Sequence, residues 1–85
     1  HKGRHLFMND TQLLLTALAE VRDDVDFVHE TRLVEDGIID SLDLTQIIAA
    51  LDEAFDIHIP AGEIEPDNFN SAEGMLALVR RYRQP

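Results

Sequence analysis

The residue whose chemistry stands out is Ser41, which lies between Asp40 and Leu42 at the start of a segment with helical periodicity. A serine in the first turn of a helix displays its hydroxyl to solvent, and the unpaired backbone N–H groups there favour a phosphate placed on it. Asp40 is a candidate N-cap for the same helix. The pattern predicts that Ser41 is an attachment point rather than a catalyst.

Other reactive side chains do not combine into a site. The chain has no cysteine, which excludes a disulfide, a thiolate metal site and a thiol nucleophile. The acidic run 23–35 lacks the spacing of a calcium-binding loop, and His29 and His58 have no partner histidine in helical register. A Ser-His-Asp hydrolase needs a cleft and an oxyanion hole that 85 residues do not easily supply. We therefore expect no catalytic residue, no metal site and no enzyme activity.

Apolar residues at helical spacing predict the elements that hold Ser41 in place. The first helix is capped by Asn9 or Asp10 and ends near Val21, and the second runs over 41–55. The segment 22–39 between them has no periodicity and is predicted to be a long loop. Its predicted anchors are Phe27, Val28, Leu33, Val34 and Ile38. The predicted apolar stripe of the second helix is Leu44, Ile47, Ile48, Leu51 and Phe55.

The C-terminal part predicts a short helical turn and a third main helix. The turn is expected at 61–64, and Pro66 is expected to break it. Asn70, with Glu73 three positions later, gives a helix-start signature, so the last helix should begin near Ser71. Its expected apolar face is Ala72, Met75 or Leu76, Val79 and Tyr82. The fold class is all-α: an up-and-down four-helix bundle with three main helices and a short third helix.

Composition narrows the class of partner. The formal net charge is -10, and the stretch 33–79 holds eleven Asp and Glu but no Lys or Arg. This excludes nucleic acid and favours transient docking to basic proteins. No run approaches the roughly 18 apolar residues of a membrane span, so we expect a cytoplasmic protein. We also expect a monomer. Residues 1–7 resemble an expression-vector remnant because Met8 is a natural start, which leaves 8–85 as a single domain.

The neighbourhood of Ser41 resembles a known family. The segment Glu35-Asp36-Gly37-Ile38-Ile39-Asp40-Ser41-Leu42-Asp43 is similar to the phosphopantetheine-attachment loop of acyl carrier proteins. The continuation into Asp52-Glu53-Ala54-Phe55 and Ile57-His58-Ile59-Pro60 also matches that family. The lead-in 35–40 resembles the D-alanyl and stand-alone aminoacyl carrier proteins. The resemblance covers 33–82.

This resemblance implies a cofactor and a set of partners. A phosphopantetheinyl transferase would attach 4'-phosphopantetheine covalently to Ser41, and Asp40 corresponds to the family's aspartate associated with the transferase's metal. The arm would hold an acyl or aminoacyl group as a thioester. The implied partners are that transferase, an acyl- or aminoacyl-activating ligase, and a downstream acyltransferase or synthase. Residues 8–85 would then be one carrier domain that catalyses nothing itself.

The surface that partner enzymes bind is expected beside Ser41. Asp43 and Gln46 should supply polar contacts there, while Leu42 and Ala49 supply apolar ones. A small or polar cargo is expected from the lead-in to Ser41. The alternative from a different class is an unmodified acidic helical adaptor, in which Ser41 is no more than part of a helix start.

Overall fold

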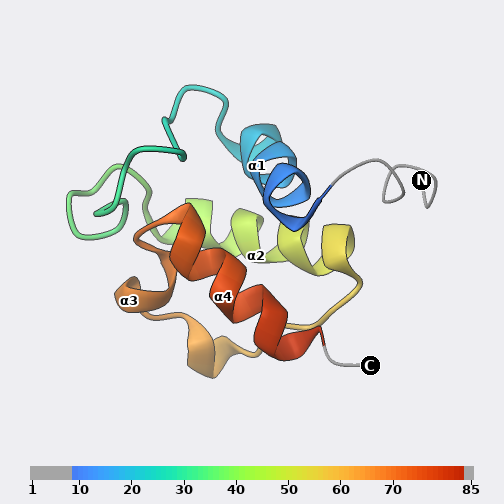
Figure 1. Cartoon of the computed structure of the whole chain (residues 1–85). Helices are drawn as coiled ribbons and strands as arrows, with labels where there is room; N and C mark the ends of the chain where they lie inside the picture. The colour runs from blue at the N-terminus through green and yellow to red at the C-terminus, as the bar shows by residue number, and fades with distance from the viewer. Residues whose placement is uncertain (1–8, 84–85) are drawn as a thin grey trace.

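The computed structural model of the chain describes residues 9–83, and the predicted vector remnant 1–7 lies outside them. The elements in chain order are α1 (Asp10–Val21), α2 (Ser41–Phe55), the short 3-10 helix η2 (Ala61–Glu63), α3 (Pro66–Phe69) and α4 (Ala72–Tyr82) (Figure 1). Residues 9–83 contain no strand. None of the helices in this range is long and apolar enough to cross a bilayer. The predicted all-α fold with three main helices and a short one is confirmed.

Both long N-terminal helices begin at a capping box. Asn9 caps α1, because its side chain accepts a hydrogen bond from the backbone N–H of Gln12 at 2.8 Å while the Gln12 side chain accepts one from Asn9. Asp40 caps α2 in the same way, with Asp43 as its partner. A capping box satisfies two backbone N–H groups that a helix start leaves unpaired. The predicted bounds of α2 and the predicted cap at Asp40 are confirmed.

The core is formed by apolar side chains from all four α-helices and the loop. Its buried members are Leu13, Leu14, Ala17, Leu18, Phe27, Leu33, Ile39, Leu44, Ile47, Leu51, Phe55, Ile59, Phe69, Met75, Leu78 and Val79. Of the predicted loop anchors, Phe27 and Leu33 are buried, whereas Val28 is 65% exposed and its prediction was wrong. Ile39, which was not predicted, is 1% exposed. It fixes the chain one residue before Asp40.

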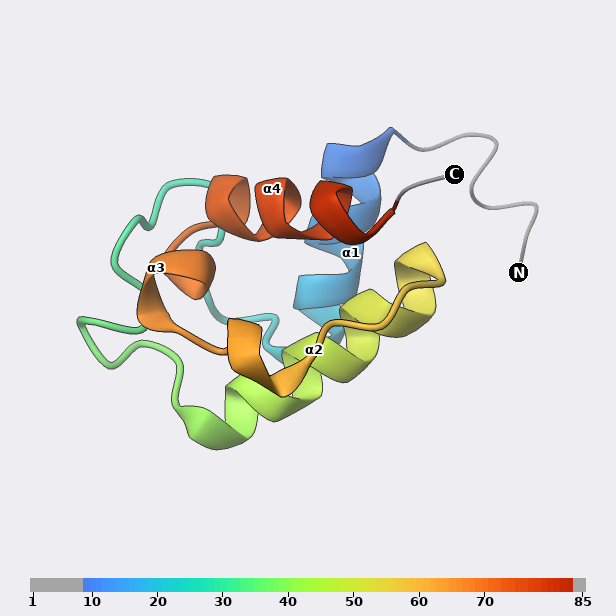
Figure 2. The same ribbon diagram turned by 90° about the horizontal axis from the view of Figure 1, so that it is seen from below.

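The helices do not follow a simple up-and-down order. Figures 1 and 2 show α2 and α4 both running from the end of the domain that holds the long loop toward the opposite end. The connection 56–71 must therefore return along the bundle before α4 can start. It contains η2 and α3. The predicted short turn near 61–64 is confirmed as η2 and ends before Pro66, but Pro66 then begins α3, which was not predicted. Proline suits that position because its missing N–H would have no helical partner there.

Asn70 ties the long loop to the junction of α3 and α4. Ser71, not Asn70, caps α4, since its Oγ accepts from the Gly74 N–H at 3.0 Å. Asn70 Oδ1 instead accepts from the N–H groups of Val34 at 3.0 Å and Glu35 at 3.1 Å. Its backbone carbonyl accepts from the Leu33 N–H at 2.9 Å. The predicted helix start near Ser71 is confirmed, but Asn70 is not the capping residue, because its amide oxygen is used across the fold.

Replacing Asn70 with Ala should loosen this loop. The substitution leaves the N–H groups of Val34 and Glu35 without their acceptor. The Val34 group is partly buried, so its loss should cost about 1–3 kcal/mol of unfolding free energy, whereas the exposed Glu35 group can bond to water. Urea denaturation followed by circular dichroism measures this loss. Amide hydrogen exchange should accelerate at those two residues. The exposed Gln46→Ala serves as the control, and a stability equal to wild type in both variants would contradict the role given to Asn70.

Candidate functional site

Ser41 occupies the first position of α2, and the residue is exposed. Its backbone carbonyl lies inside the helix and accepts a hydrogen bond from Thr45 Oγ1 at 3.1 Å. Ile39 on one side and Leu44 on the other are buried, at 1% and 8% exposure. The serine is thus held between two core anchors while its own side chain faces outward.

The first turn of α2 is closed by two carboxylates. Asp40 Oδ1 accepts from the Asp43 N–H at 2.9 Å, and Asp43 Oδ2 accepts from the Asp40 N–H at 3.2 Å. Both bonds span the peptide units on either side of Ser41. A carboxylate at a helix N-terminus is also favoured by the macrodipole. The turn that displays the hydroxyl is therefore fixed without using the hydroxyl.

Arg22 connects this turn to the end of α1. It is the C-cap residue of α1, and its Nη1 donates to Asp43 Oδ2 at 2.8 Å. Its Nε and Nη2 donate to the two oxygens of Asp24, both at 2.9 Å. The Asp43 side chain is only 14% exposed. Sequence reasoning missed Arg22, because nothing in the local pattern pairs residues so far apart.

The residues predicted to meet partners do not all lie on the surface together. Leu42 is 67% exposed, and Gln46 and Ala49 are exposed one and two turns further along α2. Residues spaced by four and seven positions share one face of a helix, so these three form a continuous strip beside Ser41. The Asp43 carboxylate instead points into the contact with Arg22. The structure gives Asp43 a role within the fold, and its predicted contact with partners stays a prediction.

The loop before Ser41 is held by its own backbone. The Leu33 carbonyl accepts from the N–H groups of Ile38 at 2.9 Å and Ile39 at 3.1 Å. Gly37 adopts a φ of +73° between them, a conformation that side chains with a Cβ rarely take. The loop is consequently a closed turn that ends at Asp40. Glycine is needed at position 37 for the turn to close.

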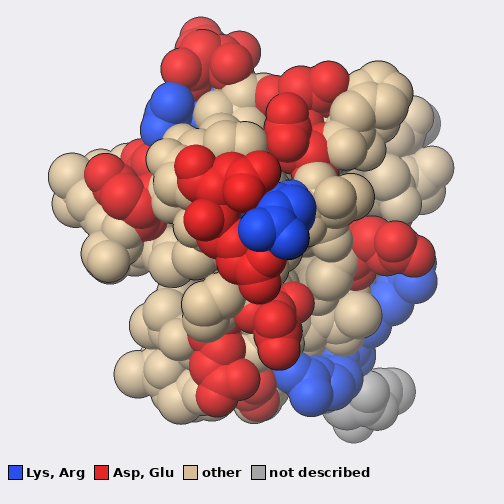
Figure 3. Space-filling model, turned by 90° about the vertical axis from the view of Figure 1, so that its left-hand side faces the viewer, with Lys and Arg blue, Asp and Glu red and all other residues tan. Residues whose placement is uncertain are grey.

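Acidic side chains run across the face that carries the long loop and α3 (Figure 3). Glu35, Asp36 and Asp40 are exposed on the loop. Arg32 pairs with Glu35 and Asp36, each at 3.1 Å, and both pairs are largely exposed. Exposed pairs of this kind contribute little to stability. The face stays predominantly acidic around Ser41, as the charge distribution of the sequence indicates.

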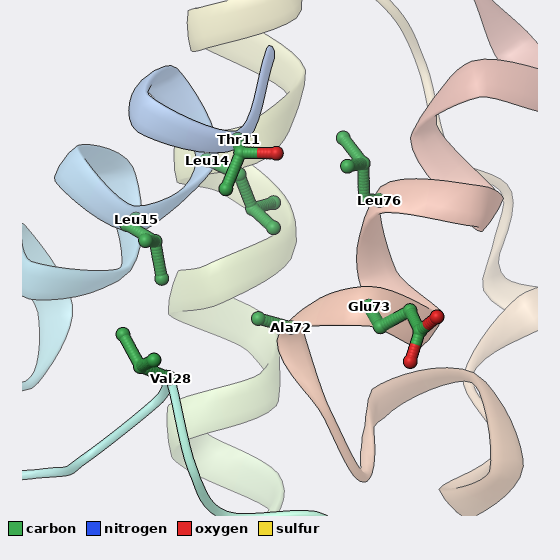
Figure 4. A pocket seen from close by; sticks show the side chains of 7 residues that line it. All are labelled: Thr11, Leu14, Leu15, Val28, Ala72, Glu73 and Leu76. Atoms are coloured by element: carbon green, nitrogen blue, oxygen red, sulfur yellow. The ribbon is translucent and has the colours of Figure 1, made fainter. Parts of the chain in front are cut away.

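An apolar pocket of about 230 Å³ lies elsewhere in the domain. Its walls come from α1, α4 and the loop, and they are lined by Thr11, Leu14, Leu15, Val28, Ala72, Glu73 and Leu76 (Figure 4). No lining residue belongs to α2 or to the turn before Ser41. The pocket is therefore separate from the serine and its neighbours.

The site can accept a phosphate-linked group. A phosphodiester on Ser41 would sit at the positive end of α2, where backbone N–H groups face an anion. The exposed side chain leaves room for a substituent that extends into solvent. Within residues 9–83 no cluster of three or more histidine, cysteine or acidic side chains could hold a metal ion. The geometry fits attachment at the surface.

Comparison with known proteins agrees with this geometry. A family model described as "Phosphopantetheine attachment site" matches residues 12–79. The D-alanyl carrier protein of Lactococcus lactis subsp. lactis is 36% identical over 64 residues, which is 75% of this chain and 76% of that protein. Aminoacyl carrier protein 1 of Bradyrhizobium diazoefficiens is 33% identical over 60 residues, 71% of this chain and 66% of that protein. The D-alanyl carrier protein of Lactobacillus delbrueckii subsp. bulgaricus is 32% identical over 54 residues, 64% of this chain and 68% of that protein.

The extent of the family match decides the class of the chain. It covers α2, α3, the long loop and most of α1 and α4. Members of this family carry acyl or aminoacyl groups on a serine-linked 4'-phosphopantetheine arm and do not catalyse a reaction themselves. The chain belongs to the phosphopantetheine-binding carrier protein family.

Proposed function

We propose that Ser41 is the residue that holds the 4'-phosphopantetheine arm. The chain contains two serines, Ser41 and Ser71. Ser71 is half-buried, and its Oγ accepts the Gly74 N–H as the cap of α4. Ser41 is exposed at the first turn of α2, where a phosphate is favoured. This contrast between the two serines is the observation that carries the assignment.

The residues around Ser41 have distinct parts in loading. A phosphopantetheinyl transferase would use coenzyme A to make the phosphodiester on the Ser41 hydroxyl, and the thiol of the arm would then hold the cargo as a thioester. Asp40 keeps its carboxylate at the surface next to the serine while one oxygen caps α2. This exposure supports the proposal that Asp40 faces the transferase and its metal during loading. The chain supplies a fixed hydroxyl, and the transferase supplies the catalysis.

We further propose that the cargo is a small aminoacyl group such as D-alanyl. The support is that the relatives are D-alanyl and aminoacyl carrier proteins. The apolar pocket between α1 and α4 does not adjoin Ser41, so it gives no support for burial of a long chain beside the arm. A small polar cargo can stay in solvent on its arm. The contacts that bind the cargo would then be made by the partner enzyme and not by this chain.

The partners proposed for the loaded form are an aminoacyl-activating ligase and a downstream acyltransferase or synthase. Both would approach the exposed strip formed by Leu42, Gln46 and Ala49. The acidic face beside it would speed encounter with basic partners. Because loading consumes coenzyme A, a cytoplasmic location fits this function.

Replacing Ser41 with Ala should abolish loading and leave the fold intact. The cap of α2 is the Asp40 side chain, so we expect the free energy of unfolding to change by no more than about 0.5 kcal/mol. Intact mass after incubation with coenzyme A and a broad-specificity transferase detects the arm. Ser71→Asn, which retains a capping side chain, is the matched control and should load normally. An arm on the Ala variant would refute the assignment, and an unloaded wild type would support an unmodified adaptor.

A bulky charge on the strip should block the ligase. Ala49 and Ala77 are both exposed in helices, so Ala49→Arg and Ala77→Arg make the same change on α2 and on α4. We expect the first to reduce kcat/KM for aminoacylation by about tenfold or more, as central interface substitutions do, and the second to have little effect. Initial rates with the holo carrier and its ligase measure both. Equal rates for the two variants would move the docking surface away from this strip.

The size of the cargo can be tested through stability. A group that enters the protein interior raises the melting temperature, because it binds the native state and not the unfolded one. We expect holo protein loaded with an aminoacyl group and with a long acyl chain to melt at the same temperature as unloaded holo protein. Circular dichroism melts of the three forms make the comparison. A clear rise with the long chain alone would indicate an interior site and refute the small-cargo proposal.

A further inference from the structure

Arg22 differs from the other described cations in what its side chain reaches. Arg32 pairs within its own loop, and Arg81 pairs with Glu63 in η2. Arg80 and Arg83 both pair with Asp10 at the start of α1. Arg22 sits at the end of α1 and contacts the first turn of α2. Arg22 is therefore placed to influence the geometry around Ser41.

The Arg22 guanidinium is oriented by Asp24, independently of its contact with α2. Asp24 accepts from Nε and Nη2 at 2.9 Å each, so two parallel bonds fix the plane of the guanidinium. These contacts hold the pKa of Asp24 below its usual range, with the hydrogen bond from Arg22 as the main cause. The same pairing raises the pKa of Arg22. The remaining donor, Nη1, is directed toward Asp43 and lies 3.4 Å from the Ile38 carbonyl.

Asp43 passes this contact on to the residue before the serine. The oxygen that accepts from Arg22, Oδ2, is the same oxygen that accepts from the Asp40 N–H. At 14% exposure, the side chain has little access to water that could replace the guanidinium. A charged donor holds a carboxylate more strongly than a neutral one does. Without Arg22, the Asp43 carboxylate could rotate away and lose its hydrogen bond to the Asp40 N–H.

We propose that Arg22 is a positioning residue for loading: through Asp43 it fixes the turn that presents the Ser41 hydroxyl to the transferase. The inference rests on the assignment of Ser41 as the attachment residue. Arg22 contacts the turn through the Asp43 carboxylate and does not touch the reacting atoms. Losing Arg22 should therefore change the orientation of the serine in the docked complex, which affects kcat. It should not change the affinity of the transferase for the carrier, which affects KM.

The test separates orientation from docking and from stability. Transferase initial rates are measured against carrier concentration with coenzyme A in excess, at a temperature where circular dichroism shows every variant folded. Arg22→Gln should lower kcat about fivefold, a modest cost for a misplaced reacting group, with KM for the carrier within about twofold of wild type. Arg32→Gln removes the same charge from the acidic loop and should leave both constants unchanged. If the loss of a positive charge anywhere on the acidic surface were the cause, KM would change in both variants. That result would overturn the proposal.

Two further variants show whether Arg22 and Asp43 act as one unit. The double variant Arg22→Gln with Asp43→Asn should be loaded no more slowly than the slower single variant, because residues in one network are non-additive. Arg22→Lys keeps the charge but cannot make the paired bonds to Asp24, and its kcat should lie between those of wild type and Arg22→Gln. If Arg22→Gln proves unstable, Arg22→Lys and Asp43→Asn carry the same comparison. Full additivity, or a wild-type kcat in the folded variants, would overturn the proposal.

A local readout excludes a purely stabilising role. Amide hydrogen exchange in Arg22→Gln should accelerate at Asp40 and Asp43, the two donors of the capping box, and stay unchanged in α4. Uniform acceleration over all helices would mean that Arg22 only stabilises the fold, and it would overturn the proposal. A wild-type protein that takes no arm would instead refute the assignment of Ser41, and this inference with it.

Discussion

The reciprocal hydrogen bonds between Asp40 and Asp43 are the constraint on which the site depends. Burial of Leu44 and Ile47 sets the rotation of α2 about its own axis, whereas the capping box sets the residue at which the helix begins. Together they leave one position for Ser41: the first turn, on the side away from the core. Neither constraint uses the serine hydroxyl, so a substituent can be added to it without breaking a contact that holds the fold.

The same turn is stabilised from two distant parts of the chain. Arg22 reaches it from the end of α1, and Asn70 holds the preceding loop from the start of the last helix. These contacts explain how a loop of about 18 residues, which would be costly to order alone, can present a defined surface. The contact with Arg22 gives the Asp43 carboxylate a role inside the domain, while the exposed acids of the loop contribute to the acidic face.

Local signals in the sequence were sufficient for α2 and for the exposure of Ser41. A capping aspartate followed by an apolar stripe specifies a helix start without reference to the rest of the chain. Signals that depend on tertiary pairing misled the prediction. Asn70 resembled a cap because its local pattern fits one, but its amide is used by the loop. The pairing of Asp43 with Arg22 could not be predicted, because Arg22 lies 21 positions away in the sequence. The end of the short turn before Pro66 was predicted, but the start of α3 at Pro66 was not, although proline is suited to begin a helix.

The hydrogen bonds between Asn70 and the long loop also bear on when the loop can fold during synthesis of the chain. They join residues 35 and 36 positions apart, and Asn70 is among the last parts of the domain to be made. A growing chain emerges N-terminal end first, so Ser41 leaves the ribosome before the residue that holds its neighbouring loop exists. The loop takes its final shape only when the last helix has been released. A chain that stops before Asn70 is thus a poor mimic of the folded domain for any enzyme that recognises this loop together with the serine.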